Sequence, residues 1–181
     1  MKLVQPIRDK NKIEDMKREL LKSGVRDYML FVFGINTGLR ISDILNLKAC
    51  DVKGREHILL IEKKTGKSKR IKINTVLRKE LDDYTKDMGD NDYIFTSRNG
   101  DNTPIGRVQA YRILNNAASN IGIDEIGTHT LRKTFGYFHY QRFKDVALLQ
   151  ELFNHSAPSV TLRYIGINQD MLDKSIDDFG L

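Results

Sequence analysis

The chain has 181 residues, of which 40% are hydrophobic and 30% are charged. This size and composition predict one globular domain with a real core, and they exclude a disordered, collagen-like or Pro-rich protein. The net charge is 30 − 24 = +6, so a polyanion such as nucleic acid is a candidate partner. The single cysteine, Cys50, excludes an internal disulfide framework. No run approaches the ~18 apolar residues of a spanning helix, and the first twenty residues hold no signal-peptide core, so we predict a cytoplasmic protein with no membrane contact.

The N-terminal part of the chain predicts three helices. Residues 1–10 form a lead-in, because Pro6 interrupts any helix there. Asn11 followed by Glu14 predicts a capping box for the first helix. The three expected helices are one from Asn11 to a stop at Ser23-Gly24, a buried one over 28–35 that ends at Gly38, and a short one over 41–47.

A hairpin with a basic tip follows. Two short β-type runs, 57–61 and 69–73, flank a charged turn built on Gly66, and 93–95 predicts a third strand of the same sheet. A charge run on a turn is usually only solvated, but lysines there can also contact DNA phosphates or deliver a proton to a leaving alkoxide. The cations of this hairpin are Lys63, Lys64, Lys67, Lys69 and Arg70.

The remaining elements are helical. Asn74 or Thr75 caps one helix, and Thr103-Pro104 predicts the start of another that runs to about Asn120. The helices flank the sheet rather than alternate with it, so we predict a mainly α fold with a small antiparallel β-sheet (α+β) and not a doubly wound one. The last four expected helices cover 129–141, 145–153, 156–164 and 169–178.

Two arginines lie where an anion could bind. Arg40, between the buried helix and the next one, either pairs with Asp43 or offers paired donors to a phosphate. His129 and Arg132 share one face at the start of a helix, and helix N-termini attract anions. This spacing does not fit zinc, because no second histidine sits at i+4 and the cysteine is distant.

A tyrosine near the C-terminus is the candidate nucleophile. Asn154-His155 is followed nine positions later by Tyr164. Tyrosine is a poor nucleophile at its reference pKa of about 10, and cationic neighbours would lower that pKa by stabilising the phenolate. Taken alone, Tyr164 is better explained as a half-buried helix residue with its hydroxyl hydrogen-bonded.

In chain order these residues resemble the catalytic domain of tyrosine recombinases, the phage and transposon integrase family. The resemblance rests on TGLR-x-S-D around Arg40, the hairpin lysine Lys64, H-T-L-R at 129–132 and N-H-S before Tyr164, and it spans residues 5–181. It implies the tyrosine recombinase catalytic-domain fold and an enzyme that cuts and rejoins DNA.

The resemblance also implies a role for each residue at the scissile phosphate. Arg40 and Arg132 would grip its non-bridging oxygens, and His155 would donate a hydrogen bond to it. Tyr164 would attack and form a 3′-phosphotyrosyl link, while His129 would help the proton transfer. No metal or cofactor is implied. The sequence itself has no Asp/Glu pair at obvious metal spacing and no Gly-rich phosphate loop, which disfavours metal-dependent nucleases and NTPases.

Three further assignments concern supporting groups. Lys64 would protonate the departing 5′-oxygen, with Lys63 and Lys67 as alternatives if the register slips by one residue. Asp43 matches an acidic family position that supports Arg40 from below. The hairpin cations expected to contact DNA are Lys63, Lys67, Lys69 and Arg70.

Two residues depart from the family pattern, and neither is expected to do chemistry. Asn154 stands where Gly is usual before the histidine, and Lys133 stands where His is frequent. For domain organisation we predict a lead-in or linker over 1–10 and the catalytic domain over 11–181. The family's N-terminal DNA-clamp domain has no counterpart in this chain, so the chain is either a fragment of a longer recombinase, which we favour, or a naturally short form.

The expected partner is double-stranded DNA. The family resemblance implies a tetramer on DNA, held by a C-terminal helix within 169–181 that docks into a neighbour; the alternative for the isolated chain is a monomer with this helix folded back. Three rival functions remain at this point: a type IB topoisomerase-like relaxing enzyme, a catalytically silent DNA-binding module of the same fold, and a basic helical domain without a DNA role. The apolar residues of the last helix are Met171, Leu172, Ile176 and Phe179.

Overall fold

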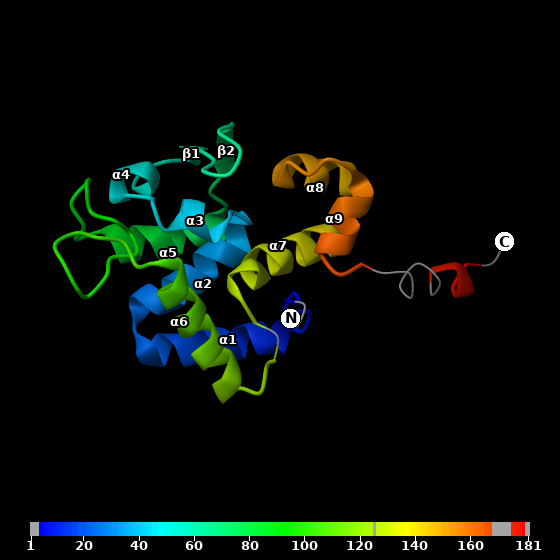
Figure 1. The fold of residues 1–181 in the computed structure, drawn as a ribbon, viewed down its shortest axis with the longest axis horizontal. Helices are drawn as coiled ribbons and strands as arrows, with labels where there is room; N and C mark the ends of the chain where they lie inside the picture. The colour runs from blue at the N-terminus through cyan, green and yellow to red at the C-terminus, as the bar shows by residue number, and fades with distance from the viewer. Residues whose placement is uncertain (1–3, 125, 168–174, 180–181) are drawn as a thin grey trace.

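The computed structural model describes residues 4–124, 126–167 and 175–179. Within these ranges the chain is mainly helical with one antiparallel hairpin, as the sequence predicts (Figure 1). The elements are α1 Lys10–Ser23, α2 Val25–Thr37, α3 Ile41–Ile44, α4 Ala49–Val52, β1 His57–Ile61, β2 Ser68–Lys72, α5 Thr75–Thr85, α6 Arg107–Asn120, α7 Thr128–Phe143, α8 Val146–Phe153 and α9 Pro158–Tyr164.

Helix α1 begins earlier than predicted. Its N-cap is Asp9, whose carboxylate accepts a hydrogen bond from the backbone N–H of Asn11 at 2.8 Å. The predicted capping box starting at Asn11 is therefore wrong, because an acidic side chain two residues upstream already satisfies that N–H. The predicted end is confirmed, since Gly24 is the C-cap.

Helix α2 is the buried helix that the apolar run predicts, and its end determines where Arg40 lies. Gly38 closes the helix in the left-handed conformation, with φ of 62°, and its N–H donates to the carbonyl of Gly34. An added Cβ at this position would also collide with the ring of Phe135 on α7. Both constraints favour glycine, and the turn places Arg40 at the N-cap of α3.

The hairpin is confirmed, but the third strand is not. His57 pairs with Lys72 and Ile61 pairs with Ser68, which places Ile58 and Ile71 toward the core. Residues 93–95 do not join this sheet. The N–H of Ile94 donates instead to the carbonyl of Leu47, so this segment pairs with the loop before α4.

The predicted start of α6 at Thr103-Pro104 is wrong. Pro104 forms an isolated bridge with Thr96, and the N–H of Ile105 donates to the carbonyl of Phe95 at 2.9 Å. These pairings keep the segment extended, and the helix begins only at Arg107. A hydroxyl followed by proline suits an extended segment as well as a helix start.

Helix α7 joins two hydrophobic clusters. Leu131, near its N-terminus, belongs to the large core built by α1–α6, whereas Phe135 packs against a smaller cluster formed by α8, α9 and the residues just after α9. Figure 1 shows α8 and α9 at one end of the molecule, with α7 running from them into the remaining helices. The buried residues of the smaller cluster are Leu149, Phe153, Ile165 and Ile167.

The predicted C-terminal helix over 169–178 lies largely outside the described residues. In the described stretch 175–179, the side chains of Ile176 and Phe179 are exposed. Over the described parts of the chain, none of the helices is both long and apolar enough to cross a membrane.

Gly136 on α7 has no side chain, which allows Phe153 of α8 and Ile165, just after α9, to approach the helix closely. A Cβ built there lies 2.7 Å from both Phe153 Cε2 and Ile165 Cγ2. We predict that Gly136→Ala lowers the free energy of unfolding by about 1–3 kcal/mol in urea titrations, because the second cluster must shift. Gly106→Ala is the control, since a Cβ at that position meets nothing within 4 Å. Equal stability of the two variants would contradict the close approach.

Candidate active site

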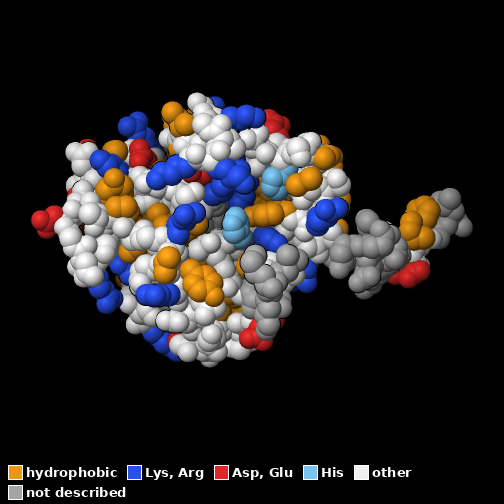
Figure 2. Space-filling view, viewed as in Figure 1, with side chains coloured by type: hydrophobic (Ala, Val, Ile, Leu, Met, Phe, Trp, Pro, Cys, Tyr) orange, Lys and Arg blue, Asp and Glu red, His pale blue; other side chains and the backbone are white. Residues whose placement is uncertain are grey.

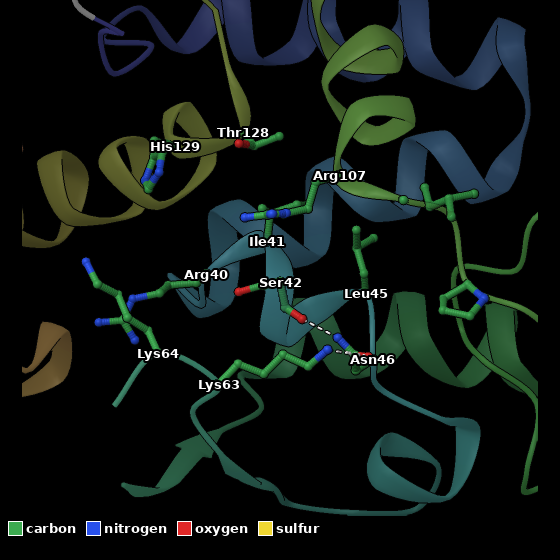
Figure 3. Close-up of a pocket in the computed structure, with 13 residues that line it drawn as sticks. Arg40, Ile41, Ser42, Leu45, Asn46, Lys63, Lys64, Arg107, Thr128 and His129 are labelled. Carbon is green, nitrogen blue, oxygen red and sulfur yellow. Dashed lines mark hydrogen bonds between the residues drawn. The ribbon is translucent and has the colours of Figure 1, made fainter. Parts of the chain in front are cut away.

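An open cavity lies between α3, the hairpin turn and the N-termini of α6 and α7. Its volume is about 710 Å³. Figure 3 shows Arg40 and Lys64 on the same side as His129 of α7, with Arg107 of α6 pointing toward the space between them. Figure 2 shows Lys and Arg side chains gathered around histidines on this face, with acidic groups mainly toward its edge. The cavity is therefore a cationic depression suited to a polyanion.

The structure brings the candidate nucleophile beside a histidine. Tyr164, the last residue of α9, has its hydroxyl 3.2 Å from Nδ1 of His129, near the start of α7. The ring of Tyr164 also lies edge-on to the ring of His155, with centroids 5.1 Å apart. His129 and Tyr164, which are 35 positions apart in the sequence, thus meet at the tyrosine hydroxyl group.

Burial decides the protonation of Tyr164. Desolvation raises the pKa of its phenol above 10.0, although the charges of Arg132 and Arg40 act in the opposite direction. The lowering by cationic neighbours that the sequence predicts is present, but the loss of water contact outweighs it, so the pKa of the phenol is raised overall. The phenol needs a proton acceptor, and the nearest imidazole is that of His129. Desolvation, followed by the charge of Arg132, lowers its pKa below 6.5, so this imidazole is unprotonated at neutral pH and has a free lone pair, although the same shift makes it a weaker base.

Arg132 is the most enclosed cation of the site. Its residue exposure is only 2%, and its guanidinium donates to two backbone carbonyls, that of Gly38 at 2.6 Å and that of Phe153 at 2.8 Å. The guanidinium carbon also lies 4.1 Å from the centre of the Phe153 ring. Arg132 therefore links the turn before Arg40 to the end of α8, and so joins the two hydrophobic clusters at the active site.

Arg40 is held by a carboxylate that the sequence analysis did not identify. Its Nη1 lies 2.8 Å from Oε1 of Glu62, which immediately follows β1. Asp43, the predicted support of Arg40, instead accepts a hydrogen bond from the backbone N–H of Lys63 at 3.1 Å and so anchors the hairpin turn. The ion-pair partner of Arg40 among the described residues is thus Glu62.

Lys69 also differs from its predicted position. Its side chain is only 11% exposed, and its ammonium contacts Glu62 Oε1 and the carbonyl of Leu152 at the end of α8. Desolvation is the main reason that the pKa of Lys69 is lowered. This placement is inconsistent with the exposed DNA contact that the charge run predicts, because the residue points inward from β2 and away from solvent.

His155 is neutral at physiological pH. Desolvation, followed by the charges of Arg132 and Arg40, lowers the pKa of its imidazole to about 4. Its Nδ1 lies 3.0 Å from the hydroxyl oxygen of Thr161 on α9. The single hydrogen of the Thr161 hydroxyl has two acceptors within reach, this Nδ1 and the carbonyl of Ala157 at 3.5 Å. When the hydrogen is donated along the shorter contact, Nε2 of His155 carries the imidazole proton and can donate to an anion.

The other hairpin cations separate into different positions. Lys63 donates from Nζ to Asn46 Oδ1 at 3.0 Å, and Lys67 donates to Asn154 Oδ1 at 3.2 Å. Lys64 is exposed, lines the cavity, and its charge contributes to the lowered pKa of His129. The guanidinium of Arg70 lies 3.0 Å from Nε2 of His57 on the exposed side of the hairpin.

Three residues of the site were missed or discounted at sequence level. Glu62 was missed because it belongs to a run of charged residues on a turn, and such runs are usually solvated. Arg107 was missed because the helix was predicted to start at Thr103-Pro104, whereas Arg107 is its first residue. Lys133 was expected to have no chemical role, but its Nζ donates to the carbonyl of Val4 and lies 5.1 Å from the centre of the Tyr164 ring. Among the residues that the structure describes, no cluster of three or more His, Cys, Asp or Glu side chains could hold a metal ion.

Comparisons with known proteins agree with this geometry. A family model described as "Phage integrase family" matches residues 8–171. The chain is similar to the "Probable integrase/recombinase YoeC" of Bacillus subtilis strain 168, with 53% identity over 99% of both chains.

Two solved structures show the same fold at low sequence identity. A crystal structure of XerA recombinase has a TM-score of 0.78 and 21% identity, and it is matched over 98% of this chain and 66% of its own. The XerH site-specific recombinase bound to palindromic difH substrate, in a post-cleavage complex, has a TM-score of 0.74 and 19% identity, with coverages of 97% and 53%. The chain thus spans about half to two thirds of these recombinases.

The half-buried neutral histidine His155 predicts a pH-dependent stability. In the unfolded chain His155 has a pKa near 6.5, against about 4 in the fold, so the unfolded state binds more protons as the pH falls through this window. Its contribution to stability is complete above about pH 6.5 and is lost toward pH 4. We predict that the melting temperature falls on acidification from pH 7 to pH 5 and that His155→Asn reduces this fall by on the order of 3 °C.

The control for this prediction is His57→Asn on β1, whose imidazole is half-buried and has a pKa lowered by desolvation, followed by the charge of Arg70, but by less than that of His155, so this change should reduce the fall by less. An unchanged acid sensitivity in His155→Asn would contradict the assignment of His155 as a half-buried neutral group.

Proposed function

The chain belongs to the phage integrase family, and we propose that it is a site-specific DNA recombinase whose Tyr164 cuts and rejoins strands through a 3′-phosphotyrosyl intermediate. The observation that carries the proposal is the contact between the Tyr164 hydroxyl and His129, a residue that lines the cavity together with Arg40 and Lys64. The charges of Arg132 and Arg40 act on the same phenol. The names of its relatives favour recombination over the topoisomerase-like and silent DNA-binding alternatives.

The first half of the reaction forms the covalent link. The oxygen of Tyr164 attacks the scissile phosphorus while its proton passes to Nδ1 of His129, in the tautomer that carries hydrogen on Nε2. Arg40 and Arg132 neutralise the charge that builds on the non-bridging oxygens, and neutral His155 donates a hydrogen bond to one of them. Preorganised cations in a partly dehydrated pocket act more strongly than they would in water.

The second half concerns the leaving group. The bond between phosphorus and the 5′-oxygen breaks, and that oxygen takes a proton from Lys64, which is exposed and lines the cavity. Lys63 and Lys67 are less suited, because each already donates to an asparagine side chain. Rejoining reverses these steps when a 5′-hydroxyl attacks the phosphotyrosine. The phosphodiester energy is retained, so the reaction requires no nucleotide.

The proposed partner is double-stranded DNA, in line with the solved structure of XerH bound to its difH substrate. Lys63, Lys67 and Arg70 are exposed cations of the hairpin that can contact backbone phosphates. We propose assembly into a tetramer on DNA through the C-terminal segment, where Ile176 and Phe179 expose apolar surface. DNA would be met in the cytoplasm, where Cys50 would stay reduced.

Covalent trapping tests the nucleophile. A duplex with the recombination site and a nick beside the scissile phosphate releases a short fragment after cleavage, so the covalent product accumulates. We predict a DNA-linked protein band on denaturing gels with the wild type and none with Tyr164→Phe, because the phenol oxygen is the attacking atom. Tyr111→Phe, an exposed residue of α6, should retain the band. A persistent adduct in Tyr164→Phe would assign the nucleophile to another residue.

Phosphate contacts predict a steep salt dependence of DNA binding. Each cation that neutralises a phosphate releases a counterion, so affinity falls with rising salt. We predict that the affinity of the full chain for duplex DNA falls about tenfold or more between 50 mM and 200 mM salt, measured by fluorescence anisotropy. An affinity that stays constant over this range would argue against an electrostatic DNA interface.

A further inference from the structure

Glu62 is a buried carboxylate that several site groups share. It is 2% exposed and follows directly after β1. Its Oε1 lies 2.8 Å from Arg40 Nη1 and 3.1 Å from Lys69 Nζ, while its Oε2 accepts a hydrogen bond from the hydroxyl of Thr65 at 2.7 Å. Both oxygens are therefore engaged, one by the cations and one by the turn.

The backbone of Glu62 is equally engaged in the hairpin turn. Its N–H donates to the carbonyl of Lys67 at 2.9 Å, and its own carbonyl accepts from the N–H of Gly66 at 2.8 Å. Lys64 lies within the turn that these two bonds close. The position of Glu62 thus determines both where the turn begins and where the guanidinium of Arg40 lies.

Arg40 depends on this one carboxylate. Within the described residues, its side chain forms no hydrogen bond, and the contact with Glu62 is an ion pair whose Nη1 lacks hydrogen-bond geometry. Arg132 differs, since two backbone carbonyls fix its guanidinium. Of the two arginines assigned to the phosphate, only Arg40 would lose its partner with a single side-chain change.

We propose that Glu62 is a positioning residue that holds the guanidinium of Arg40 in register with the scissile phosphate and connects it to the turn that carries Lys64. The proposal rests on the proposed function, because it assigns Glu62 a part in the same cleavage reaction. The carboxylate stays ionised at every pH at which the enzyme would work, since contacts with Arg40, Thr65 and Lys69 outweigh its burial and bring its pKa to about 2.

A double-mutant cycle separates this role from a structural one. The cleavage rate on the nicked duplex is measured for the wild type, Glu62→Gln, Arg40→Ala and the double variant. We expect Glu62→Gln to slow cleavage about 100-fold with little change in DNA affinity, because a misplaced group loses transition-state contacts. In the Arg40→Ala background the same change should have almost no further effect. Additive losses would overturn the proposal, because Glu62 would then act independently of Arg40.

A modified substrate supplies a second readout. Replacing one non-bridging oxygen of the scissile phosphate by a methyl group removes the charge that Arg40 neutralises. On this methylphosphonate the defect of Glu62→Gln should largely disappear, whereas a merely destabilised protein would remain slow on both substrates. The control is Glu56→Gln, which breaks an exposed ion pair with Lys72 at the base of the same hairpin and should cleave like the wild type.

Two measurements keep the proposal testable if an assay fails. If Glu62→Gln does not fold, Glu62→Asp retains the charge and shortens the reach, and it should show the same substrate-dependent defect. If the wild type forms no adduct at all, the proposed function fails, yet the nitrogen-15 relaxation of Arg40 Nε still tests the positioning. An Arg40 side chain that is as rigid in the Glu62 variant as in the wild type would refute it.

Discussion

The active site depends on one buried guanidinium. Arg132 donates to the carbonyl of Gly38, which precedes Leu39 of the large cluster, and to the carbonyl of Phe153 in the smaller cluster, and α7 connects the two. The loop that leads to Arg40 is thereby held at a fixed separation from the end of α8, which is followed by His155 in the loop before α9 and by Tyr164 at the end of α9. A lysine could not make both contacts, since its ammonium lacks the planar fork of donors. The same side chain therefore assembles the pocket and supplies charge to it.

Loss of contact with water shifts the pKa values of the tyrosine and the two histidines of the site. Desolvation raises the pKa of Tyr164 and, together with the charge of Arg132, lowers those of His129 and His155, so at neutral pH a protonated phenol lies beside neutral imidazoles. Arg40 and Lys69 both contact the carboxylate of Glu62, and the same carboxylate also acts on the charge of Arg132, so three cations share one anion and positive charge is in excess. An entering phosphate would balance that excess, and its own charge would become part of the site.

Helices and strands that are specified by residues close together in the sequence could be predicted. The site residues, which are distant in the sequence, could be identified only because their motifs resemble those of a known family. The apolar run of α2, its stop at Gly38 and the hairpin about Gly66 are of this local kind. The role of Glu62 could not be predicted, because its partner Arg40 lies on another element and a charged turn is usually solvated. The start of α6 was misplaced, since extended pairing of Pro104 with Thr96 overrides a local helix signal.

The most direct test of the account is hydrogen–deuterium exchange of Arg132→Lys, compared with the wild type by mass spectrometry. If the guanidinium joins the two clusters, peptides from α8 and α9 should lose protection while peptides from α1 and α2 keep theirs, because the large core does not depend on the contact. Unchanged protection of α8 and α9 would contradict the central role of Arg132.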